Sequence, residues 1–364
     1  MKSLVNLDVL VVYSANLAAS ASVTDAHSQH PFLLDSKQAH YNLSYAYFLD
    51  QCKKSGLNAG LTTSSDIIGP GTCQNYWTSS LGDWSQVGKR ARSRQIFDKF
   101  LPFSSAMVAE RKLMLSDKSV SPFNDVGLFD IFFDKQLTYK EFPRYAIPTV
   151  SVRSNKAIDI DIALNKLRVL MQDERYAGDF SEKIVLKDRF GASGNFVYKI
   201  SKDFAVRIKK LMLKHPTMHF VLQPFVSFDK GFAYKNKQTS TDLRLIFHHD
   251  QLLQCYIRMA KADDFRCNEH QGGQLVYVTE SDIPKRIHTI ARKIVRKINK
   301  PQSLYALDFV ISNHSHVYFI EGNIGPGIDW DVTKKVNIAM SKQLIRSIVA
   351  EFGTRINRSF KIVW

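Results

Sequence analysis

Three oxygen-bearing side chains near the end of the chain are spaced so that they could hold a divalent metal ion. Asp308 lies inside the apolar run LYALDFV, and Glu321 and Asn323 close the next apolar run, HVYFIEGN. Residues two apart on a strand point to the same face, so Glu321 and Asn323 share one. Carboxylate and amide oxygens on adjacent strands suit Mg²⁺, which also takes water and phosphate oxygens. The pattern predicts a Mg²⁺ site for a nucleoside triphosphate, with Mn²⁺ as an alternative ion.

The combination carries this prediction, because each residue alone has an ordinary explanation. Asp and Asn commonly end strands, and Glu is usually solvated. Asp308 is the hardest of the three to explain in that way, since an unpaired carboxylate inside an apolar strand is costly.

Phosphate binding has a candidate in the glycines of GASG, at 191–194, since the chain contains neither GxxxxGK[ST] nor GxGxxG. Gly191 and Gly194 let backbone N–H groups approach an anion closely, although a simple hairpin turn explains the same residues. Lys187, in the preceding apolar strand, and Lys135, after Asp134, could neutralise phosphate charge, although most lysines are merely solvated.

The elements that position these residues follow from hydrophobic spacing. We expect strands at LDVLVVYS near the N-terminus, 220–228, 243–247, 252–259, 304–312 and 316–323, a Gly-tipped hairpin at 183–200, and helices at 37–54, 158–172 and 204–214. Pro224 must lie at a strand edge or bulge. We expect 64–89 to be loop, 129–133 to be strand or turn, Ser281 to cap a helix, and the C-terminal helix, with Val336 on its apolar face, to stop at Gly353.

Length and composition fit an ordinary globular protein. The 364 residues suffice for two or three sub-domains, and 50 Lys and Arg against 34 Asp and Glu give a net charge of +16, which attracts anionic ligands. Nucleic acid is not favoured, because the basic residues form no stripe or tail. The four cysteines show no metal or redox spacing, so buried thiols are expected. No run is long enough to span a membrane, so we expect a cytoplasmic protein and, by default, a homodimer.

The order of motifs resembles the ATP-grasp ligases, particularly the branch of the ribosomal-protein S6 glutamate ligase and the glutathione synthetase-like carboxylate–amine ligases. The matching strings are DK at 134–135, IPTV at 147–150, VLK with GASG at 185–194, LQPFV at 222–226, DLR at 242–244, RMAKADDFRCNEHQGG at 258–273, ALDFV at 306–310 and FIEGNIGPG at 319–327. The resemblance covers residues 133–352, and its last three motifs are the most specific.

This resemblance implies a role for each matching residue. Lys135 and Lys187 would contact ATP, and Gly191 and Gly194 would belong to a mobile flap. The remaining residues would serve the adenine hinge (Gln223, Pro224, Phe225, Val226), the ribose (Asp242), the phosphates (Arg266, Asn268), the metal (Asp308, Glu321, Asn323) and the transition state (Arg244, Arg258, Asn323). Relatives often carry an acidic residue where this chain has Pro224, so a side-chain contact to the base from that position is lost.

The resemblance implies an α/β ATP-grasp fold in three parts. These are an N-terminal pre-ATP-grasp domain at 1–128, a small lobe with the flap at 129–226, and a C-terminal lobe with the metal site at 227–364. The expected reaction is ATP-dependent amide or peptide bond formation through an acyl-phosphate, releasing ADP and phosphate, on an amino acid or peptide, with an acidic one suggested by the charge. A kinase acting on a polyanionic small molecule and a regulatory ATP-binding protein without turnover are the alternatives.

Overall fold

The computed structural model describes residues 4–22, 29–172, 178–191, 194–328 and 334–361. The chain forms two compact units, of which unit 1 contains Met1–Asp125 and Gly325–Trp364 and unit 2 contains Val126–Ile324. Both ends of the chain therefore belong to unit 1, whereas the sequence analysis placed 227–364 in one lobe. Across the described residues, no helix combines the length and apolar character needed to cross a membrane.

Unit 1 is built on a six-stranded sheet with the order β10-β9-β2-β3-β6-β7. Its strands are β2 (Val9–Tyr13), β3 (Ala59–Thr63), β6 (Tyr76–Ser80), β7 (Asp83–Val87), β9 (Gln95–Lys99) and β10 (Ser121–Pro122). Strand β2 carries the run LVVY, is fully buried and pairs in parallel with β3 and β9. A smaller sheet contains β1 (Val5–Asn6), β8 (Ala91–Arg92), β5 (Thr72–Cys73) and β4 (Ile67–Gly69).

The expectation of a loop at 64–89 is wrong, because this segment contains β4 to β7. Leu81 and Gly82 join β6 to β7 and have φ angles of 54° and 97°. Trp77 is fully buried and donates its Nε1–H to the carbonyl of Ala19 at 2.9 Å. The many Ser, Thr and Gly residues of the segment are typical of a loop, but they lie in two antiparallel strand pairs, β4–β5 and β6–β7.

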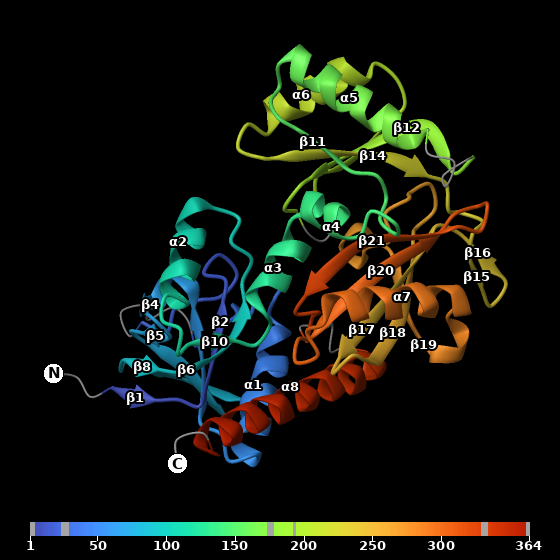
Figure 1. Ribbon diagram of the computed structural model, residues 1–364. Coiled ribbons are helices and arrows are strands. Elements are labelled where there is room, and N and C mark those ends of the chain that lie inside the picture. Colours follow the sequence, from blue (N-terminus) through green and yellow to red (C-terminus); the bar gives the residue numbers. More distant parts are fainter. Residues whose placement is uncertain (1–3, 23–28, 173–177, 192–193, 329–333, 362–364) are drawn as a thin grey trace. The chain divides into compact units, whose positions relative to one another are not determined.

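Helix α8 (Lys335–Lys361) packs on α1 (Tyr41–Lys54) in unit 1, which also contains α2 (Ser105–Met114) (Figure 1). Phe352 is fully buried and contacts the rings of Phe97 and Phe123. The expected stop at Gly353 is wrong, since the helix continues past it and a Cβ there would meet nothing within 4 Å. Val336, expected on the apolar face, is 52% exposed.

The small lobe of unit 2 is a four-stranded antiparallel sheet with the order β11-β14-β12-β13. Its strands are β11 (Val150–Val152), β12 (Phe180–Asp188), β13 (Val197–Ile200) and β14 (Phe220–Val226), and helices α5 (Ala157–Met171) and α6 (Phe204–Lys214) pack together on it (Figure 1). Pro224 lies in β14 beyond the end of its pairing with β11 and opposite a register shift in β12. The proline therefore lies at an irregularity of the sheet, as its missing N–H requires.

The large lobe of unit 2 is a five-stranded sheet with the order β19-β18-β17-β20-β21. Its strands are β17 (Thr241–His248), β18 (Gln251–Met259), β19 (Gln274–Val278), β20 (Tyr305–Ile311) and β21 (Val317–Ile324). The core under it takes residues from α3 (Val126–Phe133), α4 (Lys135–Glu141) and α7 (Lys285–Ile298), and a further antiparallel pair is formed by β15 (Ala233–Tyr234) and β16 (Lys237–Gln238).

Two local expectations in this lobe are wrong. Residues 129–133 belong to helix α3, because a short apolar run has no periodicity that separates strand from buried helix. Helix α7 begins after Pro284 rather than at a Ser281 cap. Thr279 and Asp282 instead form a capping box around a short 3-10 turn, so the polar residues here serve that turn.

Candidate active site

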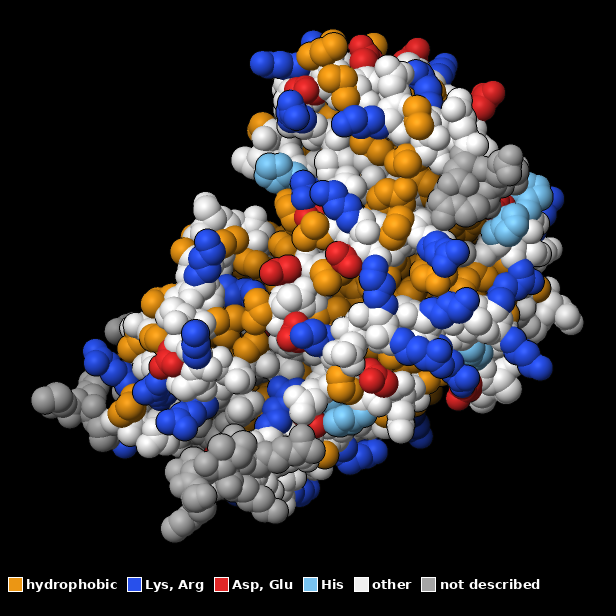
Figure 2. Space-filling model, in the orientation of Figure 1, with side chains coloured by type: hydrophobic (Ala, Val, Ile, Leu, Met, Phe, Trp, Pro, Cys, Tyr) orange, Lys and Arg blue, Asp and Glu red, His pale blue; other side chains and the backbone are white. Residues whose placement is uncertain are grey.

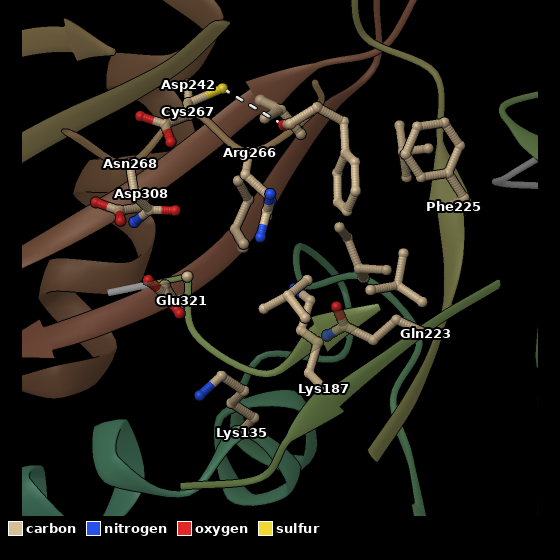
Figure 3. A pocket seen from close by; sticks show the side chains of 18 of the residues that line it. Lys135, Lys187, Gln223, Phe225, Asp242, Arg266, Cys267, Asn268, Asp308 and Glu321 are labelled. Atoms are coloured by element: carbon tan, nitrogen blue, oxygen red, sulfur yellow. Dashed lines mark hydrogen bonds between the residues drawn. The ribbon is translucent and has the colours of Figure 1, made fainter. Parts of the chain in front are cut away.

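A cleft between the two lobes of unit 2 collects most of the side chains that the sequence singles out (Figure 3). The predicted residues that line it are Lys135, Lys187, Gly191, Gly194, Gln223, Pro224, Phe225, Val226, Asp242, Arg258, Arg266, Asn268, Asp308 and Glu321. Arg244 and Asn323 are not among the lining residues, but both contact Asp308. Residues 192–193 of the GASG motif lie outside the described residues.

Asp308 is the centre of a buried network of charged groups. Its Oδ1 accepts from Arg244 Nε at 2.6 Å, and its Oδ2 accepts from Arg258 Nη2 at 2.8 Å. Arg258 also donates from Nε to Asp242 at 2.7 Å, so two carboxylates and two guanidinium groups alternate on β17, β18 and β20. Burial opposes the ionisation of Asp308, but Arg244 and Arg258 outweigh it and hold the pKa of that carboxyl below its ordinary value.

Two lysines and a glutamate form a charged part of the cleft. Lys135 begins α4, directly after the Asp134 cap, and Lys187 lies near the end of β12. The ammonium group of Lys135 donates to the carbonyl of Gly191 and points toward Glu321 (Figure 3). Burial lowers the pKa of Lys135, and burial together with Lys135 lowers the pKa of Lys187 to about 8, although Glu321 opposes both shifts. Two buried cations therefore lie close together. A bound anion would offset the free energy that they lose when burial removes their hydration.

The donor set fits a hard divalent cation. Glu321 stands opposite Asp308 on the neighbouring strand and is half-buried, and no described residue forms a hydrogen bond or ion pair with its carboxylate. Asn323 donates its Nδ2 to Asp308 at 3.2 Å, which leaves its Oδ1 as a ligand. Asp308 Oδ2 already accepts three N–H donors, so this carboxylate has only Oδ1 to offer. Glu321 and Asn323 would hold Mg²⁺, with Asp308 contributing through that single oxygen.

A buried amide with a fixed orientation lies on β14, diagonally across from Lys187. Thr149 donates its hydroxyl hydrogen to the carbonyl of Ile147 at 2.8 Å. The Thr149 oxygen must therefore accept from Gln223, whose Nε2 lies 2.8 Å away. This leaves Gln223 Oε1 as the acceptor that faces the cleft (Figure 3).

An aromatic pair lies beside this amide, and the sequence singled out only one member of it, Phe225. Phe225 and Phe265 meet edge to face with centroids 5.4 Å apart, and the ammonium group of Lys199 lies 4.7 Å and 5.0 Å from their ring centres. The cleft thus has an apolar end suited to a nucleobase and a charged end suited to phosphates.

Other lining residues were also missed by the sequence analysis, including Val185 and Cys267. Strand alternation offers a signal for Val185, because it lies two residues before Lys187 and shares its face. Nothing in the sequence marks Cys267, whose thiol is buried with its pKa raised by burial. All four cysteines are free and buried, as the composition predicted.

Two residues with predicted phosphate roles lie on the loop after β18. Arg266 donates its Nη2 to Asp264 at 2.9 Å, which holds the guanidinium against its own loop. Asn268 lies against Gly194, where a Cβ would come within 2.6 Å of the Asn268 Oδ1. The structure thus brings Gly194 and this loop together at the rim of the cleft.

Comparison with known proteins agrees with this arrangement. The sequence family described as the RimK-like ATP-grasp domain matches residues 156–348. The comparison with curated proteins found no match. Three solved structures with similar folds cover nearly the whole chain: D-cycloserine synthetase DcsG (13% identity, 95% of this chain and 100% of that one, TM-score 0.57), D-alanyl-alanine synthetase A from Vibrio cholerae (12%, 98% and 99%, 0.56), and macrocyclase MdnC bound with precursor peptide MdnA from Microcystis aeruginosa (12%, 94% and 99%, 0.52).

At these identities the structural matches establish the fold, while the family match covers more than half of the chain. The α/β fold class and the recognition drawn from the order of motifs are confirmed. The chain belongs to the RimK-like ATP-grasp domain family and has the fold of the ATP-grasp ligases.

Proposed function

We propose that this protein uses ATP to join a carboxylate to an amine, with ADP and phosphate as the other products. The observation that carries the proposal is the polarity of the cleft. Lys135 and the Glu321 carboxylate, which pairs with no described residue, lie at one end, Phe225 and Phe265 lie at the other, and Lys187 and Gln223 lie between them (Figure 3). A nucleoside triphosphate has the same polarity, with an apolar base at one end and a metal-bound triphosphate at the other.

The proposed reaction has two balanced steps. A substrate carboxylate oxygen attacks the γ-phosphorus and ADP leaves, and the amine nitrogen then attacks the acyl carbon and phosphate leaves. Lys135 and Lys187 neutralise phosphate charge, while Arg266 and Asn268 approach from the opposite rim. Glu321, Asn323 and Asp308 would hold Mg²⁺, which would supply positive charge against the phosphate oxygens.

The arginines and the absence of a protein nucleophile fit this chemistry. Arg258 lines the cleft and stabilises negative charge on the acyl-phosphate, whereas Arg244 acts through Asp308, whose carboxylate it orients. No side chain forms a bond to the substrate, so catalysis rests on positioning and electrostatic stabilisation.

Base recognition is assigned to the hinge of β14. Gln223 Oε1 would accept from the exocyclic amine of adenine, and the backbone of Phe225 and Val226 would lie along the base. Pro224 has no N–H, so its contribution is limited to apolar contact and its carbonyl. Arg258 donates hydrogen bonds to both carboxylate oxygens of Asp242. The proposed contact of Asp242 with the ribose is therefore secondary to this ion pair.

The substrates are proposed to be an amino acid or a peptide. Two of the solved structures with this fold are named for amino-acid-derived products, and one holds a precursor peptide. The net charge of +16 favours an acidic substrate, with salt dependence of turnover as its signature.

The test is Mg²⁺-dependent ADP release in the presence of pools of amino acids and short peptides. Wild type is compared with Glu321→Gln and with Glu182→Gln, a matched change at an exposed position of β12 outside the cleft. We expect release that needs both a carboxylate and an amine, that falls at least about a hundredfold in Glu321→Gln and that is unchanged in Glu182→Gln. Hydroxylamine should trap the acyl-phosphate as a hydroxamate.

Other outcomes would assign a different function. ADP release that needs a hydroxyl compound and does not depend on an amine would identify the protein as a kinase rather than a ligase. Tight Mg-ATP binding without turnover in any pool would make the protein a nucleotide-dependent regulator. Failure to bind ATP at all would contradict the whole proposal.

A further inference from the structure

A second depression in unit 2 shares no lining residue with the nucleotide cleft. It is a groove of about 1080 Å³ on the small lobe, bounded by α5, the edge of β11 and α4. Figure 2 shows Lys and Arg side chains interspersed with apolar ones on this lobe. Its members used below are Lys140, Ser151, Arg153, Ile162, Lys166 and Val169.

The groove has an excess of positive charge without internal partners. Lys140, Arg153 and Lys166 are exposed, and none forms an ion pair or hydrogen bond with a described residue. Arg189, the fourth cation of the groove, donates hydrogen bonds to both carboxylate oxygens of Asp134. The single carboxylate of the groove, Asp159, accepts from the hydroxyl of Ser154. The three free cations would be complemented by an acidic ligand.

The groove also exposes apolar surface in a regular arrangement. Ile162 and Val169 are seven residues apart on α5, two helical turns, and are 45% and 66% exposed. Apolar side chains placed between cations suit a chain that alternates acidic and apolar groups. A free phosphate or a small polyanion would leave this surface in water.

The floor of the groove meets an open sheet edge. Strand β11 pairs with β14 on one side, and no other described strand pairs with it. Gln136 Nε2 donates to the carbonyl of Thr149 at 3.0 Å, so the backbone of Thr149 points to the open side. By strand alternation the N–H and C=O of Ser151 point the same way, and no described residue bonds them. An extended peptide could pair with this edge.

We propose that this groove binds an extended acidic peptide segment, which adds as a strand to β11 and places its carboxylates against Lys140, Arg153 and Lys166. Strand pairing supplies affinity, and the cations with Ile162 and Val169 supply preference for an acidic–apolar pattern. The groove also adjoins the nucleotide cleft through sequence neighbours: Gln136 follows Lys135, and Arg189 follows Asp188. A peptide held there would tether a substrate beside the cleft.

The test uses a fluorescein-labelled peptide of about eight alternating Glu and Val residues, long enough to span roughly 27 Å. Its binding to the full chain is followed by fluorescence anisotropy without nucleotide, so the result does not depend on ligase activity. The control peptides replace Glu with Gln or N-methylate alternate amides. We expect binding that weakens about tenfold or more with each control and on raising NaCl from about 50 to about 500 mM.

Protein variants locate the site. The double variant Arg153→Glu with Lys166→Glu should weaken binding at least about tenfold, whereas Lys209→Glu with Lys210→Glu, at exposed positions of α6 outside the groove, should not. Hydrogen exchange at the Ser151 amide should slow when the peptide binds.

Four results would overturn the proposal: no binding of the peptide to wild type, equal binding of the Gln or N-methylated peptides, equal loss in the Lys209→Glu, Lys210→Glu control, or displacement of the peptide by single-stranded RNA that binds more tightly. ADP release would stand or fall separately in each case, because the variants leave the nucleotide cleft intact.

Discussion

Ion pairs between side chains of the cleft fix the positions of several charged groups. Asp308 is both a proposed metal ligand and the partner of two arginines, so its charge is retained at neutral pH and its position is fixed. Glu321 has no such partner among the described residues and is left for a cation. Burial and Lys135 lower the pKa of Lys187 to about 8, so its protonation state changes close to physiological pH.

The lowered pKa of Lys187 predicts how Mg-ATP affinity depends on pH. Below the free-protein pKa of about 8 the ammonium is already charged, so affinity is constant. Above it, nucleotide binding must take up a proton, so the association constant falls by up to about tenfold per pH unit. Titration calorimetry from about pH 7 to about pH 9 measures this. Lys187→Arg keeps its charge and should show no such slope; a slope that persists in the arginine variant would locate the titrating group elsewhere.

The hydrogen bonds that link Gln223 to Thr149 and Thr149 to the carbonyl of Ile147 predict a preference for one nucleobase. Thr149→Val removes the group that holds Gln223 Nε2, so the amide can rotate and present a donor instead of an acceptor. We expect the preference for ATP over GTP, measured as the ratio of binding constants, to fall about tenfold, the size of one hydrogen bond. Thr138→Val, which removes a buried hydroxyl bonded to the carbonyl of Ile131 outside the cleft, is the control and should leave the ratio unchanged.

At the scale of elements, the site depends on how loops approach one another around fixed strands. Strands β17, β18, β20 and β21 set the register that places Asp242, Arg258, Asp308 and Glu321 on one face. The hairpin of β12 and β13 and the loop after β18 are short-range structures, yet they meet at Gly194 and Asn268. The glycine there serves two purposes, a φ of 71° and a close approach.

This double role predicts different outcomes for two glycine substitutions. Gly194→Ala and Gly56→Ala both force a Cβ onto a positive φ, at 71° and 75°, so each should lose about 1 kcal/mol of stability in chemical denaturation. Only at Gly194 would the Cβ also meet Asn268, since nothing lies within 4 Å of Gly56. We therefore expect Gly194→Ala alone to raise the KM for ATP, by about tenfold. A similar KM in both variants would mean that the contact at Asn268 has no part in nucleotide binding.

At the scale of the whole molecule, the two ends of the chain share one core. Unit 1 takes its N-terminal sheet from residues before Asp125 and helix α8 from residues after Gly325, and unit 2 is inserted between them. Helix α8 contributes Phe352 to the aromatic cluster with Phe97 and Phe123. Unit 1 thus has to form from segments that are distant in sequence.

Removal of the Phe352 ring from this aromatic cluster should lower the stability of the protein substantially. Phe352→Ala removes a fully buried ring and should lower the free energy of unfolding by about 3–5 kcal/mol, measured by urea denaturation. Val336→Ala, on the same helix but 52% exposed, should change it by less than about 0.5 kcal/mol. Equal losses in the two variants would show that α8 contributes through helix formation rather than through packing.

The sequence by itself determined the features that depend on local pattern. Helix α6 was predicted with its observed bounds, and the Gly-tipped hairpin and the β20–β21 pair follow from apolar runs broken by turn residues. The order of motifs named the family, and the spacing of Asp308, Glu321 and Asn323 was enough to predict a shared face. Their roles as ligands stay predictions.

Tertiary structure decided what depends on residues far apart in sequence. Only pairing across strands showed that 64–89 is a set of strands, and only packing placed α8 with the N-terminal sheet. In the site, the arginines that saturate Asp308, the hydroxyl that orients Gln223, and the cations left free around β11 are all results of proximity. Spacing in a sequence fixes which way neighbours point, but a hydrogen bond or an ion pair between distant residues depends on distances that only the folded chain sets.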